Sequence, residues 1–200
     1  DATGQADNSV SLGNTSVTAV YMASDSQALV HCGGIQFPGT FVSNAGGNVL
    51  DEYEEGTWTP VVKDAQGTPN AAGMAGGATG FYTRIGQLVH VIFACQIDGV
   101  GSMQSSDNVT IHGLPFTVDD NSVGGGEPSG GIITFMNNLD STDFGSGIFV
   151  RANNGTTYFE LKYTAGGATT AIGGSPFLVS QFDAGADTYI AGSCTYKIDH

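Results

Sequence analysis

The sequence predicts an all-β protein, an antiparallel β-sandwich of the jelly-roll type preceded by a short β-rich neck. Short runs rich in β-branched and aromatic residues recur from residue 57 onward, and no stretch has the periodicity of a helix. The 31 Gly of the 200-residue chain supply many turns between these runs. Hydrophobic residues make up 40% of the chain and charged residues 12%, which provides enough apolar material for a globular core.

The first segment of the chain is polar and only weakly β-like. Alternating runs such as Val17, Ala19 and Tyr21 are interrupted by Gly and Ser, so we expect brief strands there. Such strands cannot bury a core within one chain. We therefore expect a β-rich neck or shaft at residues 1–50 and a C-terminal sandwich domain at residues 51–200.

An acidic cluster with embedded aromatic residues marks the junction between these parts. Four of the residues 51–55 are carboxylates, Tyr53 lies among them, and Trp58, the single Trp of the chain, follows. We expect Tyr53 and Trp58 to be buried anchors of the junction and of a trimer, and the neighbouring carboxylates to be solvated.

The sandwich is predicted from a series of short strand-like segments. They are TWTPVV, TGFYTRI, QLVHVIFACQI, NVTIHGLPF (one bent strand), GIITFMN, GIFVRA, TTYFELKYT, PFLVSQF and DTYIAGSCTYKI. One face of QLVHVIFACQI consists of Val89, Val91, Phe93, Cys95 and Ile97. Leu88 and Ile92 fall on its other face. These two residues need cover from a second sheet or from a neighbouring chain.

The three cysteines, Cys32, Cys95 and Cys194, are too few and too far apart for a disulfide framework or a zinc site. We expect three reduced thiols, with Cys95 and Cys194 on inward strand faces.

Composition and motifs exclude several function classes. With 5 Lys and Arg against 19 Asp and Glu, a net charge of −14, the chain has no basic stripe for nucleic acid or an anionic membrane. No apolar run is long enough for membrane insertion. Motifs for a nucleophile, a zinc ion or a phosphate loop are missing. We expect no enzyme, no cofactor and no metal, although Asp140 and Asp143 offer oxygen ligands that Ca²⁺ accepts.

Three motifs resemble one known family. NVLDEYEEGTWTPVV (48–62), TGFYTRIGQLVHVIFACQI (79–97) and NVTIHGLPF (108–116) are similar, in this order, to the C-terminal domains of bacteriophage tail fibres and tail spikes. The resemblance implies a homotrimeric virion component made in the bacterial cytoplasm and joined to the rest of the fibre on its N-terminal side. It also implies binding of a host cell-surface receptor, usually a glycan, without a cofactor.

Two alternatives to a receptor-binding tip stay open. One is a purely structural trimerisation or capping module, and the other is a glycan-cleaving enzyme, whose two carboxylates need no local motif. Residues 123–186 match nothing in the family pattern, so we expect this protein's own specificity to lie there.

Strand parity predicts the position of the receptor site. If the first strand points away from the neck, the connections 64–78, 98–106, 138–147 and 165–175 lie at the far tip, and 119–130, 153–155 and 183–187 lie near the neck. The candidate receptor contacts in the tip loops are Asn70, Met74, Met103, Gln104, Asn138, Asp140, Asp143, Phe144 and Thr169. The alternative is that long loops are merely tolerated at a free end.

Overall fold

The computed structural model describes residues 16, 32–35, 52–66, 70–120, 129–140, 147–164 and 174–199. The chain divides into two compact units, Asp1–Pro38 and Gly39–His200. The predicted neck and the predicted boundary at residue 50 fall almost entirely outside the described residues, so both stay predictions. All described strands belong to the second unit.

The described part of the chain is all-β, and the prediction of an antiparallel sandwich is confirmed. One short 3₁₀ turn, η1 (Val179–Gln181), interrupts the strands, and no helix among the described residues is long and apolar enough to cross a bilayer. The strands are β1 (Tyr53–Trp58), β2 (Val61–Asp64), β3 (Met74–Ile85), β4 (Leu88–Ile97), β5 (Val109–His112), β6 (Ser129–Met136), β7 (Ile148–Ala152), β8 (Tyr158–Tyr163), β9 (Ser175–Pro176) and β10 (Thr188–Lys197).

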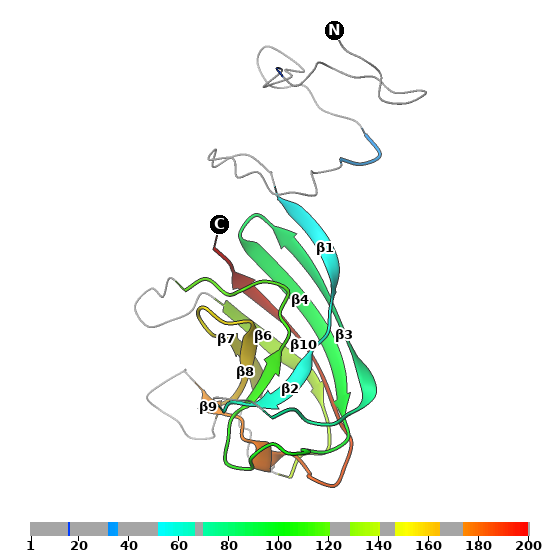
Figure 1. Ribbon diagram of the computed structural model, residues 1–200, viewed down its shortest axis with the longest axis vertical. Helices are drawn as coiled ribbons and strands as arrows, with labels where there is room; N and C mark the ends of the chain where they lie inside the picture. Colours follow the sequence, from blue (N-terminus) through cyan, green and yellow to red (C-terminus); the bar gives the residue numbers. More distant parts are fainter. Residues whose placement is uncertain are drawn as a thin grey trace. The chain divides into compact units, whose positions relative to one another are not determined.

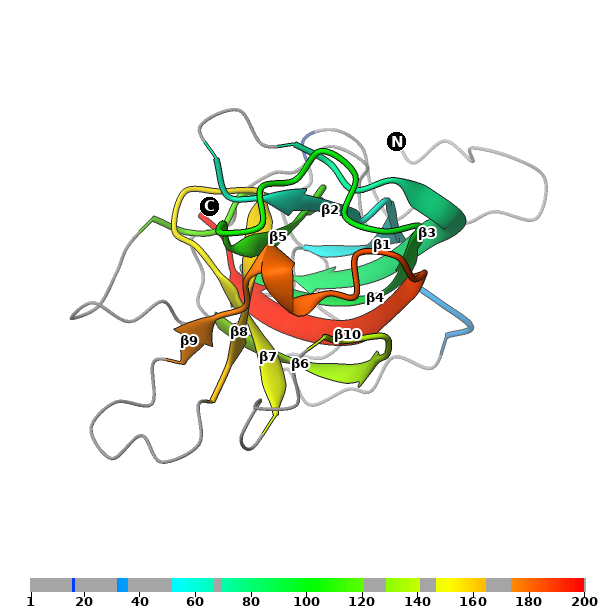
Figure 2. The same cartoon turned by 90° about the horizontal axis from the view of Figure 1, so that it is seen from below.

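The strands form a single curled sheet in the order β1-β3-β4-β10-β6-β7-β8-β5-β2, with β9 paired to β8. Every pairing is antiparallel. The strands at the two ends of this order, β1 and β2, are separated in the chain only by Thr59 and Pro60. The sheet therefore curls back on itself into a first layer, β1-β3-β4-β10-β6, that faces a second layer, β7-β8-β5-β2 (Figures 1 and 2).

The core lies between the two layers and follows from strand alternation. Along β4 and β10 every second side chain is buried, and the predicted inward face of β4 is confirmed. The largest fully buried side chains are Tyr196, Phe159, Phe177, Phe182, Ile97, Ile111, Leu161 and Ile190. These come from both layers and from the segment around η1, so one core serves the whole curled sheet.

Trp58 fills the place where the two layers join, and its predicted burial is confirmed. Its side chain is 7% exposed and makes edge-to-face contacts with Phe93 of β4 and Phe159 of β8, with ring centroids 5.9 and 6.0 Å apart. The neighbouring backbone leaves room for nothing else, because a Cβ on Gly80 would lie 2.3 Å from Trp58 Nε1. At Gly113, which has φ +97°, a Cβ would lie 2.4 Å from the Thr59 carbonyl oxygen.

The other predictions for the junction are partly wrong. Tyr53 is 42% exposed within one chain, because an odd separation from Trp58 puts it on the opposite face of β1, and its role in a trimer stays a prediction. Glu54 and Glu55 are solvated, as predicted. Glu52 is buried instead, and Arg84 of β3 forms an ion pair with it. The Arg84 guanidinium also donates to the Gly86 carbonyl, which ties the β3–β4 turn to the start of β1.

Two of the predicted strands differ from the structure. PFLVSQF contributes only β9 and η1, so it does not cross the sheet as a strand does. NVTIHGLPF stops being a strand at His112, because Gly113 turns the chain. The first difference changes the topology. Because residues 176–182 do not run from one end of the domain to the other, the chain stays at the end that it reached after β8. The connection 183–187, predicted near the neck, therefore lies at the opposite end.

The cysteines are as predicted in the structure. All three are free thiols, and Cys95 and Cys194 are buried on the inward faces of β4 and β10. Burial raises the pKa of both thiols to about 12, so they stay protonated at neutral pH. Cys32 is exposed.

We expect Trp58→Ala to lower the free energy of unfolding by about 3–5 kcal/mol, because it empties the contact between the two layers. Chemical denaturation followed by circular dichroism measures this. Glu55→Gln is the control: its side chain is exposed, and exposed charges rarely contribute more than about 1 kcal/mol, so its unfolding midpoint should stay close to that of the wild type. If Glu55→Gln destabilised the protein as much as Trp58→Ala, the seam would not depend on Trp58.

Candidate functional site

The loops that follow β2, β4 and β6 gather at one end of the sheet, which we call the distal end. The Gly86 turn and the Asn154–Gly155 turn lie at the other, proximal end, where the Lys197 carbonyl accepts from the Asp119 N–H. At the distal end, backbone bonds run from Ser180 to Ser105 and from Asp140 to Gln181. The η1 segment therefore lies between the 104–107 loop and the 138–140 loop and joins them.

Asp64 organises the first half of the distal end. Its fully buried carboxylate accepts the Asn70 N–H at 2.7 Å, the Asn70 side-chain amide at 3.1 Å and the Gln104 N–H at 3.0 Å. Burial acts to raise the pKa of Asp64, but the Gln104 and Asn70 donors outweigh it and hold that pKa below its ordinary value. One ionised carboxylate thus holds both its own loop, through Asn70, and the loop at Gln104, 40 residues further along the chain.

Asn138 organises the second half. It is the one described non-glycine residue with positive φ, at +54°, a conformation that Asn tolerates better than most residues. Its side-chain amide donates to the Asp187 carbonyl at 2.6 Å, and its own carbonyl accepts from the Asp183 N–H at 3.0 Å. Gln96 at the end of β4 donates to the Asp187 carboxylate. These bonds place residues 183–187 at the distal end.

The described residues among the predicted receptor contacts gather at the distal end, but several of them have structural roles. Asn70 and Gln104 hold Asp64, and Asn138 holds the 183–187 loop. Met103 is 6% exposed and Met74 packs against the core, so neither side chain forms an apolar platform at the surface. Asp140 is exposed. Asp143, Phe144 and Thr169 lie outside the described residues, and receptor contact by any of these residues stays a prediction.

The proximal end carries three carboxylates, Asp119, Asp120 and Asp199, whose oxygens lie within 4.8 Å of one another. Asp119 is buried and paired with Lys197, and a hydrogen bond with Asp119 raises the pKa of Asp199. Each buried or shared charge here thus has a partner within the chain, and we assign no ion to this cluster.

The outer face of the first layer is apolar, and we call it the apolar face. Large hydrophobic side chains stand half-exposed on it: Tyr53, Phe81, Ile85, Leu88, Ile92, Ile132, Phe135 and Tyr189. Phe81, Ile92, Ser193 and Ile132 are direct cross-strand neighbours in a row across β3, β4, β10 and β6. These four strands contain no Asp or Glu, although the chain has 19 acidic residues. The second layer does not cover Leu88 and Ile92, because it packs on the other face.

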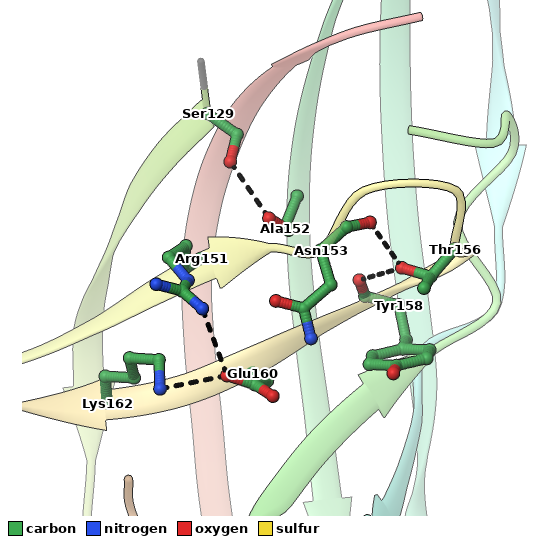
Figure 3. Close-up of polar contacts among 8 residues, drawn as sticks. All are labelled: Ser129, Arg151, Ala152, Asn153, Thr156, Tyr158, Glu160 and Lys162. Carbon is green, nitrogen blue, oxygen red and sulfur yellow. Dashed lines mark hydrogen bonds and ion pairs between the residues drawn. The ribbon is translucent and has the colours of Figure 1, made fainter. Parts of the chain in front are cut away.

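The outer face of the second layer is cationic, and sequence reasoning missed it. Lys63, Arg151 and Lys162 extend from β2, β7 and β8, and Glu160 is the one carboxylate among the outward-facing residues of β2, β5, β7 and β8. Arg151 and Lys162 both point toward Glu160, at 3.9 and 2.9 Å (Figure 3). We call Lys63, His112, Arg151, Tyr158, Glu160 and Lys162 the cationic face.

The protonation states of this face follow from its contacts. Burial acts to raise the pKa of Glu160, but Lys162, Asn153 and Arg151 outweigh it and hold that pKa below its ordinary value. Burial, followed by the charge of Lys63, lowers the pKa of His112, which is therefore neutral at pH 7. The His112 ring stacks on Tyr158 with centroids 4.7 Å apart. The sequence held one signal for this site: every second residue of TTYFELKYT, namely Tyr158, Glu160 and Lys162, is polar and falls on the solvent-facing side of the strand.

Comparison with known proteins supports the fold and leaves the family of the signature motifs a prediction. No protein family model matches the sequence. No curated protein matches it either. The chain is similar in structure to the crystal structure of the Dettilon tailspike protein (gp208), with a TM-score of 0.50 and 18% sequence identity. The match covers 71% of this chain but 23% of the tailspike chain, so it shows that this fold occurs as one part of a much longer phage tailspike.

We expect Asp64→Asn to lower the free energy of unfolding by about 1–3 kcal/mol, because an amide places its own donors among buried N–H groups. The stabilisation by Asp64 is present above the ordinary pKa of 3.8 and is lost as the pH falls through the lower pKa of the folded state. In the variant, the melting temperature should fall less between pH 7 and pH 2 than in the wild type, because no Asp64 carboxylate is protonated. Thermal melts over this pH range measure the difference. Identical pH profiles for both proteins would contradict the role of Asp64.

Proposed function

We propose that this chain is the receptor-binding part of a bacteriophage tail fibre or tail spike, and that it binds a host cell-surface glycan as a homotrimer without catalysis. The likeness of its fold to part of a phage tailspike protein supports the virion role. The signature motifs at residues 48–62, 79–97 and 108–116 point to the same class of protein.

The apolar face supports self-association, and it is the observation that carries the proposed assembly. Exposed contiguous apolar patches of this kind mark interaction sites in soluble proteins. Two of its polar side chains bind each other, since His90 Nδ1 lies 2.9 Å from Thr195 Oγ1. Copies of a chain with net charge −14 repel one another, and contact through strands without Asp or Glu keeps that repulsion smallest. A second copy therefore fits this face better than a charged partner does.

A purely structural trimerisation or capping module is the second candidate. The apolar face favours this role as strongly as it favours the first, because assembly alone would account for it. The two candidates differ in one property: only the receptor-binding tip attaches to bacterial cells. A glycan-cleaving enzyme would in addition release reducing ends from the polysaccharide that it binds.

We expect the wild-type chain to be a trimer by light scattering at micromolar concentration and Ile92→Lys to be a folded monomer. Ile92 is half-exposed and central in the apolar row, so a charge there disrupts contact between copies but not the core. Ser102→Lys adds the same charge in an exposed distal loop and should stay trimeric. A monodisperse wild-type monomer would contradict the proposed assembly.

Attachment to cells separates the two candidate functions. The labelled 200-residue chain should sediment with cells of some strains in a bacterial panel and leave others unlabelled. The monomeric Ile92→Lys variant should attach more weakly, because it loses multivalency. Trimers that attach to no strain would support the structural module instead.

A further inference from the structure

We infer that the cationic face is a recognition site for an anionic polysaccharide, a sugar polymer that carries carboxylate or phosphate groups. This inference rests on the proposed function, since it names the chemical class of the glycan and the surface that binds it. The inferred site lies on the outer face of the second layer, whereas every candidate receptor residue predicted from the sequence lies in a loop expected at the distal end.

The distribution of the five cations is the first argument. Arg84 and Lys197 are each paired with a buried carboxylate, Glu52 and Asp119, outside the second layer. The three remaining cations, Lys63, Arg151 and Lys162, extend from the outer face of β2, β7 and β8, and Glu160 is the one carboxylate that these strands and β5 turn outward. Lys162 is 8% exposed and paired with Glu160, so Lys63 and Arg151 are the cations that would meet a ligand. This face thus carries excess positive charge on a protein whose net charge is −14. An anionic polymer is repelled by such a protein as a whole and attracted only at this surface.

The cross-strand register brings the charged groups into one band. Lys63 pairs with Thr110 on β5, Thr110 pairs with Glu160 on β8, and Glu160 pairs with Arg151 on β7. Lys63 and Arg151 therefore stand on either side of Glu160, three strands apart. Within the described residues no carboxylate forms an ion pair with the Lys63 ammonium. A chain of sugars laid across the strands would meet two cations in succession.

The same surface provides a ring platform for the sugar itself. His112 and Tyr158 stack at 4.7 Å beside the charged band, and His112 Nε2 is held by Thr110 Oγ1 at 3.1 Å. Neutral aromatic rings next to a few fixed polar groups are the composition of a small-molecule site that gains affinity from apolar contact and specificity from polar contact. Arg adds a planar fork of donors that matches a carboxylate or a phosphate.

The position of the face agrees with assembly through the apolar face. The apolar face belongs to the first layer and the cationic face to the second, and the core separates them. Copies that pack through their first layers leave their second layers accessible. Each trimer would then present three cationic faces, so that weak single contacts with a repeating polymer add up. Four of the six cationic-face residues lie within residues 123–186, the part of the chain outside the family resemblance.

The test measures binding of the 200-residue chain to three soluble polymers: polygalacturonate, its fully methyl-esterified form and glycerol teichoic acid. We expect binding to at least one of the two anionic polymers, weakened by salt, and no binding to the ester, which keeps the sugar but removes the charge. The anion that binds identifies carboxylate or phosphate as the recognised group. Binding to neither anionic polymer, or equal binding to the ester, overturns the inference.

Variants locate the binding on the surface. Lys63→Gln and Arg151→Gln should each weaken binding by about tenfold, the effect of one charge-assisted hydrogen bond. Glu160→Gln should strengthen binding several-fold, by about 1 kcal/mol or less, because it removes the competing carboxylate. Lys197→Gln changes the net charge as Lys63→Gln does but lies at the proximal end, so its affinity should equal that of the wild type. Equal losses in Lys197→Gln and Lys63→Gln overturn the inference, and melting curves verify that each variant is folded.

Cell attachment separates failure of this inference from failure of the proposed function. If Lys63→Gln and Arg151→Gln attach to cells as the wild type does, while Asn138→Gly with Asp140→Ala does not, the receptor site is distal and only the inference fails. If the wild type attaches to no strain in the panel, the proposed receptor role fails, and the polymer measurements still decide whether the face binds anions.

Discussion

The fold depends on the contact of Trp58 with Phe93 and Phe159, because this contact joins the two layers at the seam of the curled sheet. β1 and β2 are consecutive in the chain but lie at opposite ends of the strand order, so the two residues between them must carry the chain from one layer to the other. Glycines at positions 80 and 113 let the backbone approach the indole and the seam closely. A single large ring thus contacts both layers of the curled sheet and belongs to their common core.

Charge is distributed over this domain in a way that its composition does not reveal. The strands of the first layer beyond β1 have no carboxylates, and the strands of the second layer hold three of the five cations of the chain. Strongly acidic chains stay soluble through mutual repulsion, which opposes assembly as well as aggregation. Segregation resolves this conflict, since each outer face has its own electrostatic character while the net charge stays far from zero.

Strand alternation could be read from the sequence, whereas contacts between distant strands could not. The inward face of β4 follows from a period of two, and it holds for Val89, Val91 and Cys95. The same rule applied between Tyr53 and Trp58 would have placed Tyr53 outside, but the aromatic character of both residues was given more weight. Glu52 was misjudged because its partner, Arg84, is 32 residues away and the pairing of β1 with β3 was unknown. The cationic face was missed for the same reason: Lys63 and Arg151 come to lie on one face only through three strand pairings.

The position of β10 in the middle of the first layer has a consequence for synthesis. β10 pairs with β4 on one side and with β6 on the other, and it is the last strand of the fold in chain order. Until residue 197 has left the ribosome, β4 and β6 therefore expose unpaired edges beside apolar side chains, which is the situation in which nascent β-proteins aggregate. The first layer is therefore complete only once β10 has been added between β4 and β6.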